Sequence, residues 1–269
     1  MNDTFRAIIL GIVEGITEFL PISSTGHMIL VMPWIGIDNG DPFWNDVFNF
    51  FIQIGAILAV VIYFWPRLWK LSFHPPNKAW HEHILLKLFV AILPAGVLGT
   101  LLDDFMKEKL MNVPVVASAL VVGGIAILVI EKMIRHPKIT DAGSISLRVA
   151  LLIGLAQCLA MIPGTSRSGA TIMGALLLGL TPVAAAEFSF FLAIPTLLGA
   201  GMLSLLKGLD KIQPGQGIPL AVGFIVSFIV AWAVVAGFMR FIQTHKFTSF
   251  AVYRIVLGGI FLAVMLTRG

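Results

Sequence analysis

Charged residues are scarce in this chain: Asp, Glu, Lys and Arg together make up 12% of its 269 residues. A soluble domain carries about 25%, so this chain lacks the means to cover a water-facing surface. Hydrophobic residues reach 58%, and the mean hydropathy is +0.96. The composition excludes an ordinary soluble protein and predicts an all-α polytopic membrane protein that is surrounded by membrane lipids.

Cysteine is almost absent, and the net charge is small. The single Cys158 excludes an internal disulfide and a cysteine metal cluster. It lies in an apolar run, so we expect a small buried hydrophobic side chain. The net charge of +4 does not indicate nucleic acid as a partner, because the basic residues are scattered at the ends of apolar segments, where membrane topology explains them.

Long apolar segments divide the chain. A transmembrane helix needs about 20 apolar residues, and the segments that qualify are 48–65, 84–102, 113–130, 187–206, 218–239 and 250–266. Two more apolar regions, 5–35 and 149–180, are interrupted by polar breaks at 21–26 and 163–169. Non-helical backbone at membrane depth must be surrounded by protein or water. We therefore expect two re-entrant helix hairpins.

The two broken regions resemble each other, which predicts an internal duplication. An alignment that starts from Pro21 and Pro163 places Ser23 over Thr165. We expect a single integral membrane domain over the whole chain, built from two repeats at about 1–135 and 145–269. Each repeat is one hairpin plus three transmembrane helices. Because three is odd, the repeats must have inverted topology, an architecture that places sites near the membrane midplane.

Loop charges predict the orientation. Three connections hold ten Lys or Arg residues, Arg254 among them, whereas two others hold four. The three are 66–83, 131–148 and 240–254, and the two are 103–112 and 207–216. Cytoplasmic loops carry the excess of Lys and Arg. Both termini are then outside, the first hairpin enters from the outside and the second from the cytoplasm, so that the polar breaks can meet.

The first polar break follows an acidic pair. Glu14 and Glu18 are four residues apart and share one helix face, where like charges repel. A divalent cation, the Arg167 guanidinium or a shared proton would offset this repulsion; solvation near the membrane interface is the alternative. The break itself contains Ser23, Ser24, Thr25, Gly26 and His27. Ser and Thr are ordinary N-caps, but a helix N-terminus also binds anions, and a histidine titrates near neutral pH.

The second polar break contains Gly164, Thr165, Ser166, Arg167, Ser168, Gly169, Ala170 and Thr171. Glycine allows close backbone approach, the hydroxyls donate hydrogen bonds, and Arg167 can bind a phosphate through two parallel hydrogen bonds. A structural ion pair between Arg167 and a glutamate is the alternative, and both can hold in the resting state.

Together these groups fit phosphoryl chemistry on a lipid. Arg167 and backbone N–H groups would neutralise a diphosphate, a metal on the glutamate pair would assist, and His27 would work with Ser24. The chain has no P-loop, kinase or zinc signature. A lipid transporter or flippase with the same inverted-repeat architecture is the alternative, although it would not need His27 beside Ser24.

The two motifs closely resemble a known family. The sequence EGITEFLPISSTGH, from Glu14 to His27, and the sequence PGTSRSGAT, from Pro163 to Thr171, are similar to those of the bacterial undecaprenyl-diphosphate phosphatases, also called bacitracin-resistance proteins. The likeness runs nearly end to end. It implies hydrolysis of undecaprenyl diphosphate to the monophosphate, which recycles the lipid carrier for peptidoglycan synthesis and gives bacitracin resistance.

The resemblance also implies residue roles and a location. Its essential residues match Glu18, Ser24, His27 and Arg167, and its supporting residues match Glu14, Ser23, Thr25, Ser166, Ser168 and Thr171. With Gly26, Thr165 and Gly169, the supporting residues of the two loops are expected to bind substrate; Glu14 and Glu18 are expected to bind a divalent cation (Mg or Ca). The site is expected to open on the periplasmic side of the bacterial cytoplasmic (inner) membrane. A homodimer is compatible with this arrangement.

The nucleophile is open at this point. Ser24 activated by His27, with Glu18 as orienter or metal ligand, is the preferred interpretation. His27 as a direct phosphoryl acceptor and a metal-activated water are the alternatives.

Overall fold

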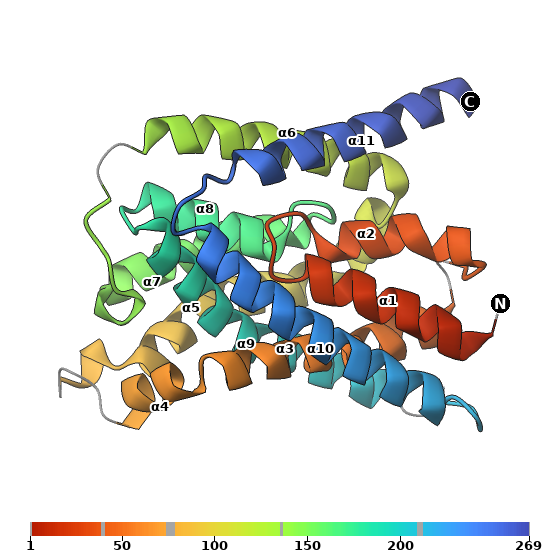
Figure 1. The fold of residues 1–269 in the computed structure, drawn as a ribbon, viewed down its shortest axis with the longest axis horizontal. Helices are drawn as coiled ribbons and strands as arrows, with labels where there is room; N and C mark the ends of the chain where they lie inside the picture. Colours follow the sequence, from red (N-terminus) through yellow and green to blue (C-terminus); the bar gives the residue numbers. More distant parts are fainter. Residues whose placement is uncertain (1, 39–40, 74–78, 135–136, 209–211, 269) are drawn as a thin grey trace.

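The computed structural model describes residues 2–38, 41–73, 79–134, 137–208 and 212–268, and these residues are almost entirely helical (Figure 1). In chain order the elements are α1 (Asp3–Thr17), α2 (Ser24–Val31), η1 (Met32–Ile35), η2 (Phe43–Phe48), α3 (Asn49–Tyr63), α4 (Trp65–Phe73), η3 (Trp80–Glu82), α5 (Ile84–Phe105), η4 (Met106–Leu110), α6 (Val113–Met133), η5 (Ala142–Ser144), α7 (Leu147–Gln157), η6 (Cys158–Met161), α8 (Arg167–Leu177), α9 (Pro182–Gly208), α10 (Gly217–Phe241) and α11 (Thr248–Arg268).

Six helical segments are long and apolar enough to cross a bilayer, which confirms a polytopic membrane protein. They are Phe43–Tyr63, Ile84–Leu102, Val113–Met133, Pro182–Met202, Gly217–Phe241 and Thr248–Thr267. Many large apolar side chains on them are exposed, such as Phe89 and Ile229. This is the surface that lipid covers, because a folded soluble protein rarely leaves so large an apolar area in contact with water.

The two broken apolar regions form two short helix hairpins, α1–α2 and α7–α8, as predicted. In each hairpin the second helix begins directly after a serine with positive φ, Ser23 (75°) or Ser166 (76°). These two serines are the non-glycine residues with positive φ in the described part of the chain. Each serine hydroxyl caps its helix by accepting from a backbone N–H three residues on, that of Gly26 (3.2 Å) or Gly169 (3.1 Å). Ser23 is therefore equivalent to Ser166 and not to Thr165, so the alignment from the prolines is wrong by one residue.

Helices α6 and α11 lie side by side and pack through glycines (Figure 1). A Cβ added to Gly124 would meet the Ala251 carbonyl oxygen at 2.8 Å, and one added to Gly258 would meet the Ala117 carbonyl oxygen at 2.6 Å. The two contacts are reciprocal, because the two glycines lie 134 residues apart in the sequence and so do the two alanines. Reciprocal contacts of this kind are expected between two helices that a two-fold axis relates.

Three expectations need correction. The connection 66–83 contains part of a further helix, α4, which carries exposed aromatic side chains. The first transmembrane segment begins at Phe43 and not at residue 48, because a π-helical turn, η2, precedes α3. Arg254 is not a loop cation: it lies inside α11 and is 1% exposed. Without it, nine Lys or Arg residues remain in the expected cytoplasmic connections, and two of them, Lys78 and Arg135, lie outside the described residues. Of the four basic residues in the opposite connections, Lys211 also lies outside the described residues.

Candidate active site

The buried Arg254 guanidinium holds the two hairpin loops together. Its Nη1 donates to the carbonyl oxygens of Pro21 (3.0 Å) and Thr165 (2.9 Å), and its Nη2 donates to those of Gly164 (2.9 Å) and Ala119 (3.1 Å). The sequence interpretation missed this role because it placed Arg254 in a loop. The available signal was a charged residue inside an apolar segment, which is costly in a membrane and usually functional.

Hydroxyl groups make a second link between the loops. Ser168 Oγ donates to the carbonyl oxygen of Leu20 (2.7 Å) in the first hairpin loop and lies 3.0 Å from Ser166 Oγ. The expectation that the two polar breaks meet is confirmed. Ser168 is fully buried, so it positions the loop and does not line the cavity described below.

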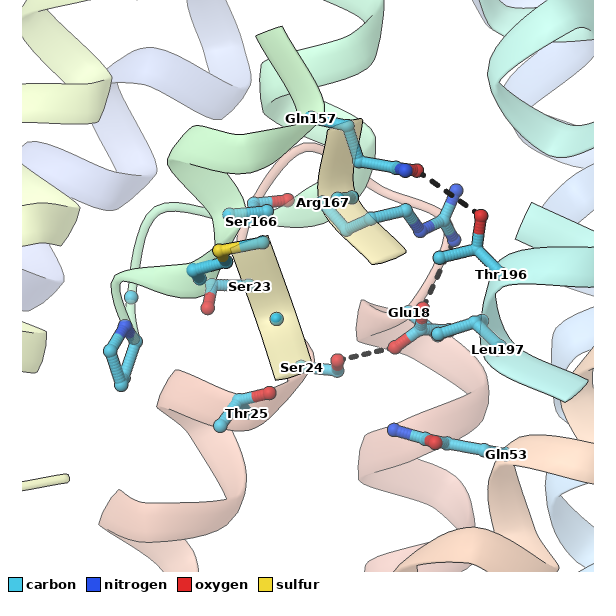
Figure 2. Close-up of a pocket in the computed structure, with 16 residues that line it drawn as sticks. Glu18, Ser23, Ser24, Thr25, Gln53, Gln157, Ser166, Arg167, Thr196 and Leu197 are labelled. Atoms are coloured by element: carbon cyan, nitrogen blue, oxygen red, sulfur yellow. Dashed lines mark hydrogen bonds and ion pairs between the residues drawn. The ribbon is translucent and has the colours of Figure 1, made fainter. Parts of the chain in front are cut away.

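Glu18 connects the chemical groups of the two hairpins (Figure 2). Its Oε1 accepts from Arg167 Nη2 at 3.0 Å, and its Oε2 accepts a very short hydrogen bond from the Ser24 hydroxyl. Glu18 is 5% exposed and Ser24 is 8% exposed. The carboxylate can therefore accept the hydroxyl proton of Ser24 while Arg167 stabilises its charge. The ion pair between Arg167 and a glutamate, the alternative to phosphate binding in the sequence analysis, is present.

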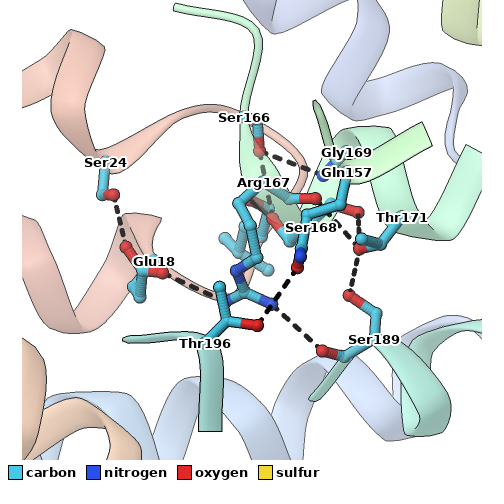
Figure 3. Close-up of polar contacts among 11 residues, drawn as sticks. Glu18, Ser24, Gln157, Ser166, Arg167, Ser168, Gly169, Thr171, Ser189 and Thr196 are labelled. Carbon is cyan, nitrogen blue, oxygen red and sulfur yellow. Dashed lines mark hydrogen bonds and ion pairs between the residues drawn. The ribbon is translucent and has the colours of Figure 1, made fainter. Parts of the chain in front are cut away.

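Arg167 is held on three sides (Figure 3). Beside its bond to Glu18, its Nη1 donates to the Ser189 carbonyl oxygen (3.0 Å), and its guanidinium carbon lies 5.8 Å from the centre of the Phe19 ring. Thr171 supports this arrangement, because its Oγ1 lies 2.6 Å from Ser189 Oγ. Arg167 Nε, by contrast, is buried and has no hydrogen-bond partner among the described residues.

His27 faces α11 and not the serine expected beside it. Its Nδ1 is 2.7 Å from the Ser23 carbonyl oxygen, and its Nε2 is 2.7 Å from the Tyr253 hydroxyl. A carbonyl only accepts, so Nδ1 carries the proton and Nε2 accepts from Tyr253. Among the hydrogen bonds of the described residues, the side-chain partner of Ser24 is Glu18. Nothing in the local sequence pointed to Tyr253, which is 226 residues away.

Glu14 lies one helical turn before Glu18 and is 2% exposed. Its Oε1 has no hydrogen-bond partner within the described part of the chain. No cluster of three or more His, Cys, Asp and Glu side chains suited to a metal occurs among those residues. The glutamate pair thus offers two carboxylates, one of which is already engaged by Arg167 and Ser24.

A cavity of about 280 Å³ brings these groups together. Its lining consists of Glu18, Ser23, Ser24, Thr25, Gln53, Ala95, Gly99, Gln157, Ala160, Met161, Pro163, Gly164, Ser166, Arg167, Thr196 and Leu197. Of the predicted substrate-binding residues, those outside this lining are Gly26, Thr165, Ser168, Gly169 and Thr171. Gln157 and Thr196, which were not predicted, contribute to it. Gln157 follows the apolar stretch 149–156, and Thr196 lies within the apolar stretch 190–203; that contrast is the signal that could have revealed them.

The arrangement can be compared with known proteins. The sequence model of the family described as bacitracin resistance protein BacA matches residues 7–260. The chain belongs to this family. Its BacA relatives include proteins named undecaprenyl-diphosphatase in Parvibaculum lavamentivorans (47% identical, covering 97% of each chain) and Fusobacterium nucleatum (48% identical, covering 96% of this chain and 99% of the relative). Undecaprenyl-diphosphatase 1 of Clostridioides difficile is 47% identical and covers 97% of this chain and 96% of its own. Both polar motifs lie inside all of these BacA matches, because each match covers nearly the whole chain.

Proposed function

We propose that this chain is an integral membrane phosphatase that hydrolyses undecaprenyl diphosphate to undecaprenyl phosphate and inorganic phosphate. The observation that carries the proposal is the series Ser24–Glu18–Arg167 on one cavity wall, a nucleophile, a base and an anion-binding cation in contact. The names of the relatives supply the substrate. The reaction would recycle the lipid carrier for peptidoglycan synthesis and give bacitracin resistance.

The geometry favours Glu18 as the base for Ser24. The Ser24 oxygen attacks the terminal phosphorus while its proton passes to Glu18, and the bridging P–O bond to the lipid monophosphate breaks. Water then releases inorganic phosphate from the serine. Arg167 and the N-termini of α2 and α8 neutralise the charge that develops on the phosphoryl oxygens. His27, held by Tyr253, is a positioning residue behind Ser23 in this scheme.

A divalent cation, Mg or Ca, is proposed at the glutamate pair. The unpartnered, buried Oε1 of Glu14 fits such an ion, with Glu18 on the same helix face. Mg²⁺ is usually bound by one or two carboxylates, with substrate phosphates and water completing its coordination. When bound, the ion would polarise a phosphoryl oxygen as a Lewis acid.

The location and symmetry belong to the same proposal. We place the protein in the bacterial cytoplasmic membrane with the cavity open to the periplasm, supported by nine Lys or Arg residues on the expected cytoplasmic side against four opposite. The capping serines Ser23 and Ser166 and the reciprocal contacts between α6 and α11 support two inverted repeats. A homodimer stays a prediction, which a detergent-corrected mass measurement tests.

Phosphate release from a prenyl diphosphate by the detergent-purified protein tests the function. We expect turnover that stops with a chelator and falls at least 100-fold in Ser24→Ala and Arg167→Ala. Trapping the phosphoryl group on Ser24 during turnover would establish the nucleophile; trapping it on His27, or nowhere, would favour the other two routes. If no phosphate is released but labelled lipid crosses vesicle membranes that contain the protein, the transporter alternative holds instead.

A further inference from the structure

The cavity has a second polar wall that the proposed reaction leaves without a role. It is formed by Gln157 at the end of α7 and Thr196 in α9, across from Ser24 (Figure 2). Gln157 is 2% exposed, and its Nε2 has no hydrogen-bond partner among the described residues. Thr196 Oγ1 lies 3.5 Å from Gln157 Oε1, in position to donate to it. That contact orients the amide and leaves its nitrogen for another acceptor.

Arg167 stands between this wall and the reactive groups (Figure 3). Its two terminal nitrogens are engaged by the Ser189 carbonyl oxygen and by Glu18, whereas its Nε has no partner in the described chain. Leaving a buried donor without a partner costs free energy. Small rotations of Gln157 and Arg167 toward a bound oxyanion would recover this cost for both donors at once.

The chemistry of this wall selects an anion. Among the described residues that line the cavity, Glu18 is the one carboxylate, and both of its oxygens are already engaged. Gln157 lies 143 residues after Glu14, the spacing that also separates Ser23 from Ser166. The first hairpin therefore presents an unpartnered carboxylate oxygen at this position, whereas the second presents an unpartnered N–H donor. The donor suits a phosphate, and the acceptor suits a cation.

Resting on the proposed hydrolysis, we propose that Gln157 Nε2 and Arg167 Nε form the subsite for the phosphoryl group that is not attacked, the one that stays on the lipid. Ser24 and Glu18 face the phosphoryl group that is attacked, and Arg167 touches both regions. Thr196 is a positioning residue that fixes the Gln157 amide. The subsite makes the enzyme select two linked phosphates over one.

Two competing anions distinguish a subsite for the second phosphate from a site that binds any single phosphate. Methylenediphosphonate, which is not hydrolysed, fills both phosphate positions, whereas inorganic phosphate fills one. Their inhibition constants are measured against conversion of a prenyl diphosphate, with the lipid product separated by chromatography. In Gln157→Leu we expect the constant for the diphosphonate to rise about ten-fold, the loss of one charge-assisted hydrogen bond. The constant for phosphate should stay within two-fold.

Further variants keep the test sharp. Gln157→Glu should weaken diphosphonate binding more than the leucine variant, because its carboxylate repels the phosphate. Gln157→Asn keeps the amide but shortens its reach, and should give the same selective loss if the leucine variant does not fold. The control is Gln243→Leu, the same change at an exposed position outside the cavity, which should alter neither constant.

The outcomes divide clearly. Unchanged constants in all folded Gln157 variants, or equal losses for both anions, would overturn the second-phosphate subsite. Failure of the wild-type protein to convert the lipid would instead overturn the proposed function. Calorimetric binding of the diphosphonate to wild type and variants then decides on the subsite without any turnover.

Discussion

Replacing Arg254 by methionine should destabilise the protein strongly, and the structure indicates by how much. The guanidinium donates to five carbonyl oxygens, and those of Ala119 and Leu120 belong to the interior of α6. The other three, on Pro21, Gly164 and Thr165, lie in the hairpin loops and have no other hydrogen bond within the described residues. Three acceptors left unsatisfied, each taken at about 1–1.5 kcal/mol, the lower part of the range for a buried group, give a loss of roughly 3–5 kcal/mol.

The assay is thermal unfolding of the detergent-purified protein, followed by phosphate release well below the midpoint. At about 2–4 °C per kcal/mol for a chain of this size, Arg254→Met should lower the midpoint by roughly 10 °C. Arg254→Lys should fall in between, because an ammonium has three donors and cannot serve all five carbonyls. The matched control is Arg240→Met at an exposed position near the end of α10, which should change the midpoint by less than about 2 °C.

Activity is expected to fall together with stability in this variant, since the loops that Arg254 holds carry the reactive groups on both hairpins. A methionine variant with a wild-type midpoint and wild-type turnover would refute the conclusion that this arginine joins the loops. A normal midpoint with lost turnover would show that Arg254 acts on the chemistry and contributes nothing to folding.

Three further changes test the site. Glu18→Gln removes the base but keeps the shape, so phosphate release, measured well below the thermal midpoint, should fall at least 100-fold; a loss below ten-fold would exclude Glu18 as the base. Tyr253→Phe removes the hydroxyl that donates to the histidine and should lower turnover about two- to ten-fold, whereas Tyr63→Phe should not; equal effects would contradict the positioning role. Gly164→Ala combines a φ of +93° with a Cβ that would meet a carbonyl oxygen at 2.5 Å, so this variant should have a much lower thermal midpoint than Gly179→Ala. Gly179 has a similar φ (+91°) but open space around its added Cβ. Similar midpoints for the two variants would contradict the close approach at Gly164.

The sequence was sufficient for the helices and the hairpins because their signals are local. An apolar run of about 20 residues and a polar break inside such a run follow directly from the cost of exposing backbone to lipid. The groups within each motif were predictable for the same reason. An ion pair between Arg167 and one of the glutamates was one of the alternatives, because an ionisable group at membrane depth needs a partner and few charged residues are available.

The remaining parts of the site depend on distant pairs that no local pattern specifies. Tyr253 reaches His27 because α11 lies beside the first hairpin, and Gln157 reaches the cavity because η6 turns the chain between α7 and the second loop. The expected partnership of His27 with Ser24 came from sequence proximity alone. In the helix, the two side chains project differently, and the carbonyl of Ser23 holds the imidazole toward α11.

The register of the two hairpins explains how one local structure provides two chemical roles. Because Ser23 and Ser166 are equivalent caps, the next residue in each hairpin, Ser24 or Arg167, is the first residue of its helix. These two equivalent positions meet at Glu18, whose two oxygens bind one each. The two similarly capped hairpins thus supply the proposed nucleophile from one and the proposed anion-binding cation from the other. The glutamate that joins them has Met161 at the equivalent position of the second hairpin, 143 residues later, so the pairing cannot form twice and the site is single.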